Sequence, residues 1–116
     1  MTFGQLIAKL RKEKNLQLKD LAALIKREDG QLVSYQYISD LEHGRRPAPS
    51  NHLLDEFAHA FGVSRQFLYL KVNRLPPDFN APDDEAVANA AYEALCKRAK
   101  PRATGKGAMR TKAKAA

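Results

Sequence analysis

The chain has 116 residues, 44% of them hydrophobic and 28% charged, with a formal net charge of +7. This length suits one domain plus an appendage. The single cysteine, Cys96, excludes an intrachain disulfide, and no apolar run approaches the ~20 residues needed to cross a bilayer, so we expect a soluble cytoplasmic protein.

The positive charge is unevenly distributed. Residues 1–79 carry 12 basic and 9 acidic side chains, residues 80–96 carry 4 acidic and no basic ones, and residues 97–116 carry 8 basic and no acidic ones. Because most of the excess lies in the last segment, net charge alone does not identify the folded part as a nucleic-acid binder.

Hydrophobic spacing and capping residues predict a first helix over residues 2–14. Thr2 and Gln5 have capping-box spacing, and Asn15 can take the left-handed conformation beyond the helix end. A second helix is expected from about Leu18 to Glu28, with Gly30 as its stop. Ser34 is expected to cap a short third helix that ends at Gly44.

A fourth helix is expected from a cap at Ser50 or Asn51 to Phe61, and a fifth from Ser64 to the proline pair at Pro76. Residues 78–82 form a linker, and a weak sixth helix is expected from Asp83 to about Lys97. The low-complexity residues 99–116 should be disordered. The sequence thus predicts an all-α chain in three parts, residues 1–77, 78–98 and 99–116.

The third helix carries polar side chains at positions that its apolar residues leave free, which is how a helix is presented to a DNA groove. Gln36 suits a bidentate contact to adenine, and Asp40 could accept from a cytosine amino group. Tyr35 and Ser39 could contact bases or phosphates. A solvated polar face explains the same pattern equally well.

Two charged features flank this helix. Arg45 and Arg46 follow it directly, where they suit phosphate contacts, although any helix C-terminus favours cations. His43 is a possible further phosphate contact. Arg11 and Glu42 would pair if the first and third helices pack together, but the local pattern alone favours two solvated charges.

The sequence predicts no enzyme, metal or cofactor site. Its three histidines do not fall at metal-ligand spacing, and one cysteine is too few for a zinc site. Nucleophile, base and orienting residue do not gather in any convincing pattern, and no small-molecule pocket is evident.

Taken together, these residues resemble the Cro/repressor-type helix-turn-helix family, also called the XRE family, over residues 3 to about 70. The motif residues are Leu10, Arg11, Leu21, Ala22, Val33, Ser34, Ile38, Ser39, Leu41, Glu42, Gly44 and Pro49.

The resemblance implies a five-helix domain that binds double-stranded DNA, with Arg11 and Glu42 as a structural ion pair. It places base reading on Tyr35, Gln36, Ser39 and Asp40, and phosphate binding on Gln17, His43, Arg45 and Arg46.

Two features depart from the family pattern. The turn from Ala22 to Val33 has about six more residues than the usual tight turn, which we assign to an extra turn of the second helix and a loop around Gly30. Leu18 stands where the family often has a phosphate-touching residue.

Regulators of this type usually bind two half-sites as symmetric dimers. The surplus apolar residues of the fifth helix, Phe67, Tyr69, Leu70 and Val72, are candidate dimer contacts, although the sixth helix could equally cover them. The leading hypothesis is therefore a sequence-specific transcriptional regulator, acting as a repressor at the nucleoid. The alternatives are a helix-turn-helix module for protein partners, such as an antitoxin or anti-repressor, and a non-specific nucleoid binder that uses the basic tail, residues 97–116.

Overall fold

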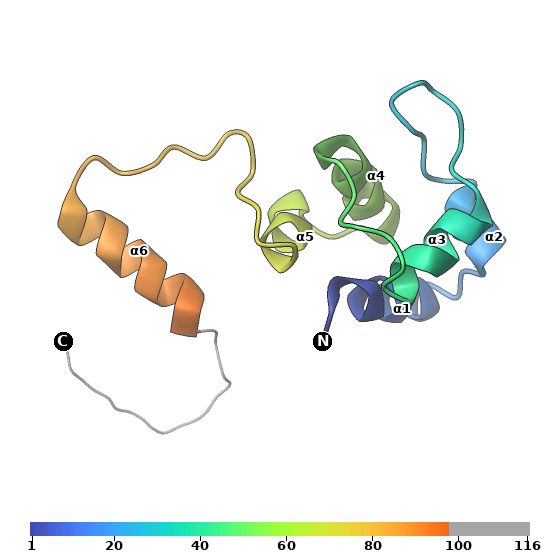
Figure 1. Cartoon of the computed structure of the whole chain (residues 1–116), viewed down its shortest axis with the longest axis horizontal. Coiled ribbons are helices and arrows are strands. Elements are labelled where there is room, and N and C mark those ends of the chain that lie inside the picture. Colours follow the sequence, from blue (N-terminus) through green and yellow to red (C-terminus); the bar gives the residue numbers. More distant parts are fainter. Residues whose placement is uncertain (98–116) are drawn as a thin grey trace. The chain divides into compact units, whose positions relative to one another are not determined.

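The computed structural model describes residues 1–97 of the chain. These residues divide into two units, the first spanning Met1–Phe79 and the second beginning at Asn80. The first unit contains helices α1 (Phe3–Glu13), α2 (Leu18–Ala22), α3 (Tyr35–Glu42), α4 (Asn51–Phe61) and α5 (Arg65–Lys71), and the second contains α6 (Glu85–Lys97) (Figure 1). The all-α class is confirmed, since the only β pairing within residues 1–97 is one isolated bridge. The expected disorder of residues 99–116 concerns residues outside the described part.

Side-chain caps fix the starts of α1, α3 and α4 where the sequence predicts them, whereas Ser64 precedes α5 without a side-chain cap bond. Thr2 and Gln5 form a reciprocal capping box, with N···O distances of 2.9 and 3.1 Å. Ser34 caps α3 and Ser50 caps α4, because each hydroxyl accepts from the backbone N–H three residues later. Asn15 has the expected left-handed backbone, with φ 58°.

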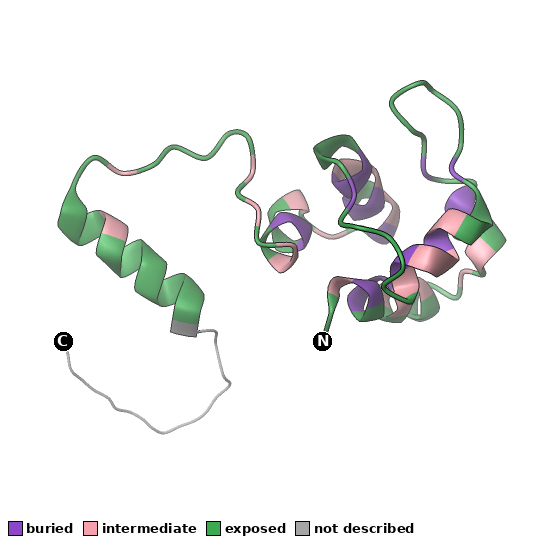
Figure 2. Ribbon diagram, in the orientation of Figure 1, coloured by how far each residue is buried: buried purple, intermediate pink, exposed green. Residues whose placement is uncertain are grey.

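The first unit has one hydrophobic core. Its buried residues come from the inward faces of all five helices and from the segment before α3 (Figure 2). The apolar stripes predicted from helical spacing supply most of them, so periodicity located this core. The buried side chains are Leu6, Ile7, Leu21, Ala22, Ile25, Val33, Ile38, Leu41, Leu53, Leu54, Phe57, Ala58, Phe61, Leu68 and Tyr69.

The second helix is much shorter than predicted. It ends at Ala22, and the expected extra turn through Glu28 is wrong. The chain instead forms a small hairpin over residues 25–33, which Figure 1 shows projecting between α2 and α3. The N–H of Val33 bonds to the carbonyl of Ile25, and Lys26 and Leu32 form an antiparallel bridge. Gly30 is not a helix stop; its φ of 85° closes the hairpin turn.

Hydrogen bonds join the hairpin to α4 and to its cap residue, Ser50. The backbone N–H of Lys26 donates to Glu56 Oε1 at 2.9 Å, and its carbonyl lies 2.9 Å from His52 Nε2. Ser50 Oγ donates to Glu28 Oε2 at 2.7 Å. The first two contacts satisfy both backbone groups of Lys26 and the third links two side chains, so the hairpin is an integral part of the unit.

The fifth helix also ends earlier than predicted. It stops at Lys71, and Asn73 turns the chain with a φ of 61°, so the proline pair lies beyond the helix end.

The candidate dimer contacts on this helix differ in exposure. Phe67 and Leu70 stay 44% and 40% exposed. The suggestion of Tyr69 as a dimer contact is wrong, because this side chain is fully buried in the monomer's own core. Val72 is half-buried and packs against the same core.

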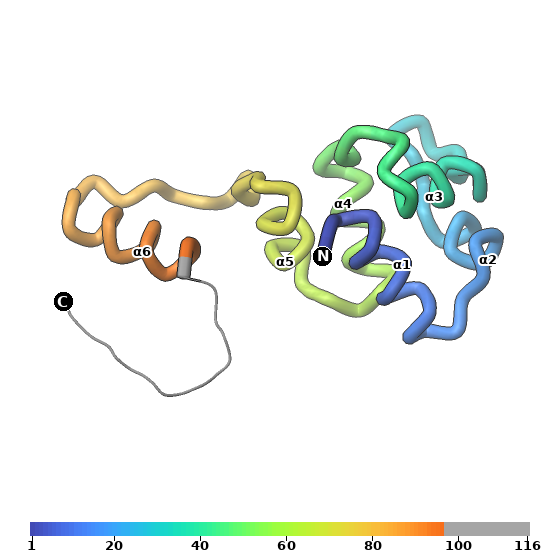
Figure 3. The backbone as a smooth tube through the Cα atoms, turned by 60° about the horizontal axis from the view of Figure 1, so that its bottom comes forward, coloured from blue at the N-terminus to red at the C-terminus, as the bar shows by residue number. Residues whose placement is uncertain are grey.

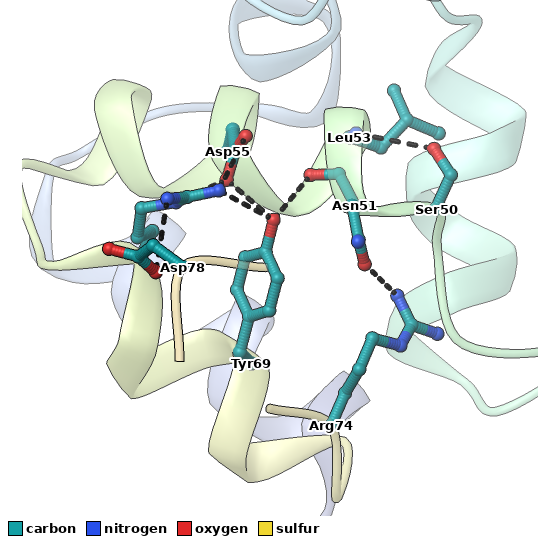
Figure 4. Close-up of polar contacts among 8 residues, drawn as sticks. Ser50, Asn51, Leu53, Asp55, Tyr69, Arg74 and Asp78 are labelled. Atoms are coloured by element: carbon teal, nitrogen blue, oxygen red, sulfur yellow. Dashed lines mark hydrogen bonds and ion pairs between the residues drawn. The ribbon is translucent and has the colours of Figure 1, made fainter. Parts of the chain in front are cut away.

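Tyr69 is buried because polar partners satisfy its hydroxyl (Figure 4). The hydroxyl donates to Asp55 Oδ1 at 2.9 Å, lies 3.3 Å from the carbonyl oxygen of Asn51, and accepts from Arg65 at 3.2 Å. Burial raises the pKa of Tyr69, which keeps the hydroxyl protonated as a donor. Arg74 adds a parallel link by donating to the side chain of Asn51 at 3.0 Å. This network joins α5 and the segment after it to α4.

Removing the hydroxyl should weaken this joint. We expect Tyr69→Phe to lower the free energy of unfolding by about 1 kcal/mol, because the ring still fills the core while the hydrogen bond to Asp55 is lost. Urea unfolding of the full chain measures the change. The exposed Tyr35→Phe is the matched control and should leave stability unchanged; an equal loss in both variants would contradict the role assigned to Tyr69.

The second unit contributes α6 to the described residues. Its start is two residues later than predicted, because Asp84 serves as the cap and its carboxylate accepts from the N–H groups of Ala86 and Val87. Within residues 1–97, none of the helices has the length and apolar character needed to cross a bilayer.

Candidate nucleic-acid interface

Helix α3 is packed on one side and open on the other. Ile38 and Leu41 are buried on its inner side, and the helix lies beside both α1 and α2 (Figures 1 and 3). Tyr35 and Gln36 are exposed at its first turn, while Ser39 is half-buried one turn further. The structure therefore brings the expected base-reading residues onto one helix and leaves the first two accessible.

Asp40 differs from the other predicted base readers because its carboxylate is already engaged within the chain. Oδ1 accepts from Gln36 Nε2 at 3.0 Å and from Arg45 Nε at 3.0 Å, and Oδ2 lies 3.6 Å from Arg46 Nε. Hydrogen bonds from Gln36 and then Arg45 lower the pKa of Asp40 below its ordinary value. The Asp40 side chain is only 17% exposed. A contact from this carboxylate to a base would compete with these partners.

The backbone after α3 explains how Arg45 reaches Asp40. Gly44 adopts the left-handed conformation, with φ 74°, and the N–H of Arg45 donates to the carbonyl of Asp40 at 2.8 Å. This Schellman-type helix end turns the chain back along the helix, so residue 45 returns beside residue 40. Arg46 also lies over the ring of Tyr37, 5.4 Å from its centroid.

The angle of α3 is held from behind by an ion pair with α1. Arg11 Nε and Nη2 donate to the two carboxylate oxygens of Glu42 at 2.6 and 3.1 Å. Arg11 Nη1 also donates to the carbonyl of Leu16 at 2.9 Å, and the two charged side chains are 13% and 7% exposed. The hydrogen bond to Glu42 raises the pKa of Arg11. The structure thus brings together the two charges that the local pattern alone left apart.

Gly4, which no sequence motif singled out, lets these two helices approach. Gly4 is buried in α1, and a Cβ at this position would contact the carbonyl oxygens of Leu41 and Glu42, the latter at 2.7 Å. Only a residue without a side chain fits between α1 and the end of α3. A glycine near a helix start is the only signal for this contact that the sequence offers.

The expected phosphate-binding residues lie at helix ends. Gln17 is exposed at the start of α2, where its N–H donates to Asp20 at 2.9 Å. His43 is exposed at the end of α3, with Nδ1 2.8 Å from the carbonyl of Ser39. If Nδ1–H donates there, a neutral ring has only an accepting nitrogen left, so only the protonated ring can donate to a phosphate. Arg45 and Arg46 are about half exposed despite their bonds to Asp40.

The described residues, 1–97, contain no group of three histidine, cysteine or acidic side chains placed to hold a metal ion. The chemistry of this surface is that of amides, hydroxyls and guanidinium groups. Such groups bind base edges and phosphate oxygens in protein–DNA complexes.

The sequence profile of the helix-turn-helix family matches residues 7–68, more than half of the chain. The chain belongs to the XRE-type helix-turn-helix family. As a member of this family it is a DNA-binding transcription regulator.

Two solved structures resemble this regulator. The clp gene regulator ClgR from Corynebacterium glutamicum is 26% identical, with 82% of this chain and 83% of that chain covered and a TM-score of 0.48. The complex of the SinR and SinI proteins contains a chain that is 25% identical, with 86% and 84% covered and a TM-score of 0.48. No curated protein sequence matches significantly.

The long turn of this family member is built as the 25–33 hairpin. Beside the start of α3, the hairpin borders a hollow of about 340 Å³ whose lining includes Arg27, Ser34, Tyr37 and Arg46. Arg27 is paired with Asp29 on the same hairpin. The insertion therefore adds one arginine near the first turn of α3 but also the carboxylate that neutralises it.

Proposed function

We propose that this regulator recognises a specific duplex sequence by placing α3 in the major groove. The observation that carries the proposal is the open face of α3: Tyr35 and Gln36 are exposed while the opposite face is packed against α1 and α2. An exposed glutamine at the first turn of such a helix can make a bidentate contact to adenine. Ser39 is the third proposed base contact.

Residues around this helix would position it on the phosphate backbone. Arg45 and Arg46 follow α3 directly, and His43 ends it. Gln17 lies at the start of α2, which crosses the backbone in helix-turn-helix proteins. Contacts of this kind fix orientation and register but do not read sequence.

We further propose that the protein binds as a homodimer and represses transcription at the nucleoid. Phe67 and Leu70 expose apolar surface on α5, where a second copy could bury it. A symmetric dimer would read two half-sites about one helical turn apart. Such a dimer, seated over a promoter, would block polymerase by occupancy.

Selection of bound sites from a pool of random duplexes tests specificity and dimerism together. The proposal predicts a palindromic consensus. A consensus without symmetry would contradict the dimer, and a pool that does not converge would contradict sequence-specific reading. The whole 116-residue chain is used throughout.

Gel-shift titration of two variants then separates reading from positioning. Gln36→Ala should cost about 1–3 kcal/mol on the selected site and relax preference at one base pair. Arg45→Ala should weaken selected and random duplexes alike and reduce the salt slope by about 1. Gln66→Ala, which removes an exposed glutamine from α5, is the control. Loss of preference in the control, or none with Gln36→Ala, would contradict the assignment.

A second candidate, a non-specific DNA binder, is favoured by the 8 basic and no acidic residues of segment 97–116. Such a segment binds phosphates by releasing counterions. If this candidate is right, a chain truncated after Cys96 loses most of its affinity while Gln36→Ala has no effect. The main proposal expects Gln36→Ala to weaken binding to the selected site more than the truncation does.

A further inference from the structure

The exposed side of α3 carries a closed group of side chains, which we call the Asp40 cluster: Gln36, Asp40, Arg45 and Arg46. Gln36 and Arg45 each donate a hydrogen bond of 3.0 Å to the Asp40 carboxylate, and Arg46 forms an ion pair with it at 3.6 Å. The spacing of four residues puts Gln36 and Asp40 on one helix row, and the turn at Gly44 brings Arg45 back to the same point. The cluster is therefore built by the backbone of α3 and its end.

The cluster fixes the amide of Gln36. With one Nε2–H donated to Asp40, the second Nε2–H and the Oε1 oxygen remain free. These are the two groups that a bidentate contact to adenine requires. A glutamine amide without such a partner would rotate, and its ordering would reduce the free energy gained on binding.

The cluster also restrains the arginines that are best placed for phosphates. Arg45 and Arg46 each form an ion pair with Asp40, so together the three residues carry one net positive charge instead of two. To bind phosphates fully, the two arginines would have to leave the Asp40 carboxylate, which is 17% exposed. This carboxylate would then face the negatively charged DNA without its cationic partners. This cost applies to every duplex, whatever its sequence.

Fixing the Gln36 amide favours binding to the specific site, and restraining the arginines weakens binding to all other duplexes. Both effects raise the ratio of specific to non-specific affinity. We propose that Asp40 is a specificity-determining positioning residue, which orients Gln36 for its base and limits the sequence-independent affinity of Arg45 and Arg46. The inference rests on the proposed reading of the major groove by α3. It replaces the expected direct contact from Asp40 to cytosine with an indirect role.

Asp40→Asn is the sharpest test, because it keeps the shape of the side chain and removes its charge. Binding of the full chain is measured on the selected duplex and on a random duplex over a series of salt concentrations. We expect binding to the random duplex to tighten several-fold, with a salt slope steeper by about 1. The ratio of selected to random affinity should fall by about tenfold, the size of one weakened base-pair contact.

Glu13→Gln is the matched control. It removes the same charge from the same unit and releases Lys9, its partner on α1 at 3.8 Å. We expect at most a small, equal gain on both duplexes. If Glu13→Gln changes the affinity ratio as much as Asp40→Asn does, net charge alone explains the effect and the inference is overturned.

The remaining outcomes are equally decisive. An unchanged ratio and slope for Asp40→Asn would overturn the inference while leaving groove reading intact. Preference lost at a C·G pair alone, with an unchanged random-duplex slope, would indicate a direct contact from Asp40 instead. If the wild-type chain itself prefers no site, the proposed function fails first. Asp40→Ala is the second variant should the asparagine variant unfold, since alanine favours helix.

Discussion

Gly4→Ala should destabilise the first unit by about 2–3 kcal/mol, although alanine is the better helix former by up to about 1 kcal/mol. The added methyl group would overlap the carbonyl oxygens of Leu41 and Glu42 at the end of α3. Those atoms belong to helix backbone and cannot rotate away as a side chain would. The clash must therefore move α3 against α1, with the packing losses that follow.

Urea unfolding of the full chain measures this loss, which is a large part of the ~5–15 kcal/mol typical of a small domain. Lys12→Ala is the control, because Lys12 is exposed on the same helix and its replacement should stay within about 0.5 kcal/mol. A Gly4→Ala chain that is as stable as the wild type would show that α1 and α3 do not approach as closely as the structure has them.

Features set by neighbouring residues were predicted well. The sequence predicts caps at Thr2 and Ser34, and at Ser50 or Asn51, because a cap needs only a polar side chain and a backbone N–H a few residues away; the structure selects Ser50. The core stripes followed from helical periodicity in the same way. The Arg11–Glu42 pair is different: nothing local favours it, and only the family resemblance anticipated it.

The hairpin shows how a local signal can be misinterpreted. Gly30 fits the end of a long second helix, yet the pair Asp29-Gly30 between apolar residues is also a hairpin signal. The apolar positions Ile25, Leu32 and Val33 fit pairing across such a turn. Tertiary bonds from α4 to Lys26 and Glu28 then favour the hairpin, and no spacing rule within the segment reveals them.

The candidate site was predicted in its location but not in its internal contacts. Helical spacing correctly placed Tyr35 and Gln36 on an exposed face. It could not show that Asp40 would turn toward Arg45, because that contact depends on the left-handed backbone at Gly44. Tyr69 was misassigned for a related reason: its burial depends on partners in α4, which are distant in sequence.

The second large effect should come from Arg11→Ala, which we expect to cost about 3 kcal/mol of stability. Glu42 is 7% exposed and would be left as a nearly buried carboxylate without its bidentate partner. The carbonyl of Leu16 would lose its donor as well. An exposed ion pair is worth only about 0–1 kcal/mol, so the size of the loss distinguishes a structural pair from a surface one.

A charge-free double variant tests whether the unpaired carboxylate causes this loss. Glu42→Leu combined with Arg11→Met removes both charges but keeps apolar volume, so the double variant should be more stable than Arg11→Ala. It should not recover fully, because neither replacement can donate to the carbonyl of Leu16. We expect its DNA affinity to stay below that of the wild type even where it is folded, since the bidentate bonds that set the angle of α3 are gone. Wild-type DNA affinity in a folded double variant would show that core packing alone orients α3. If Arg11→Ala lowers the free energy of unfolding by less than about 0.5 kcal/mol, the pair behaves as if it were solvent-exposed.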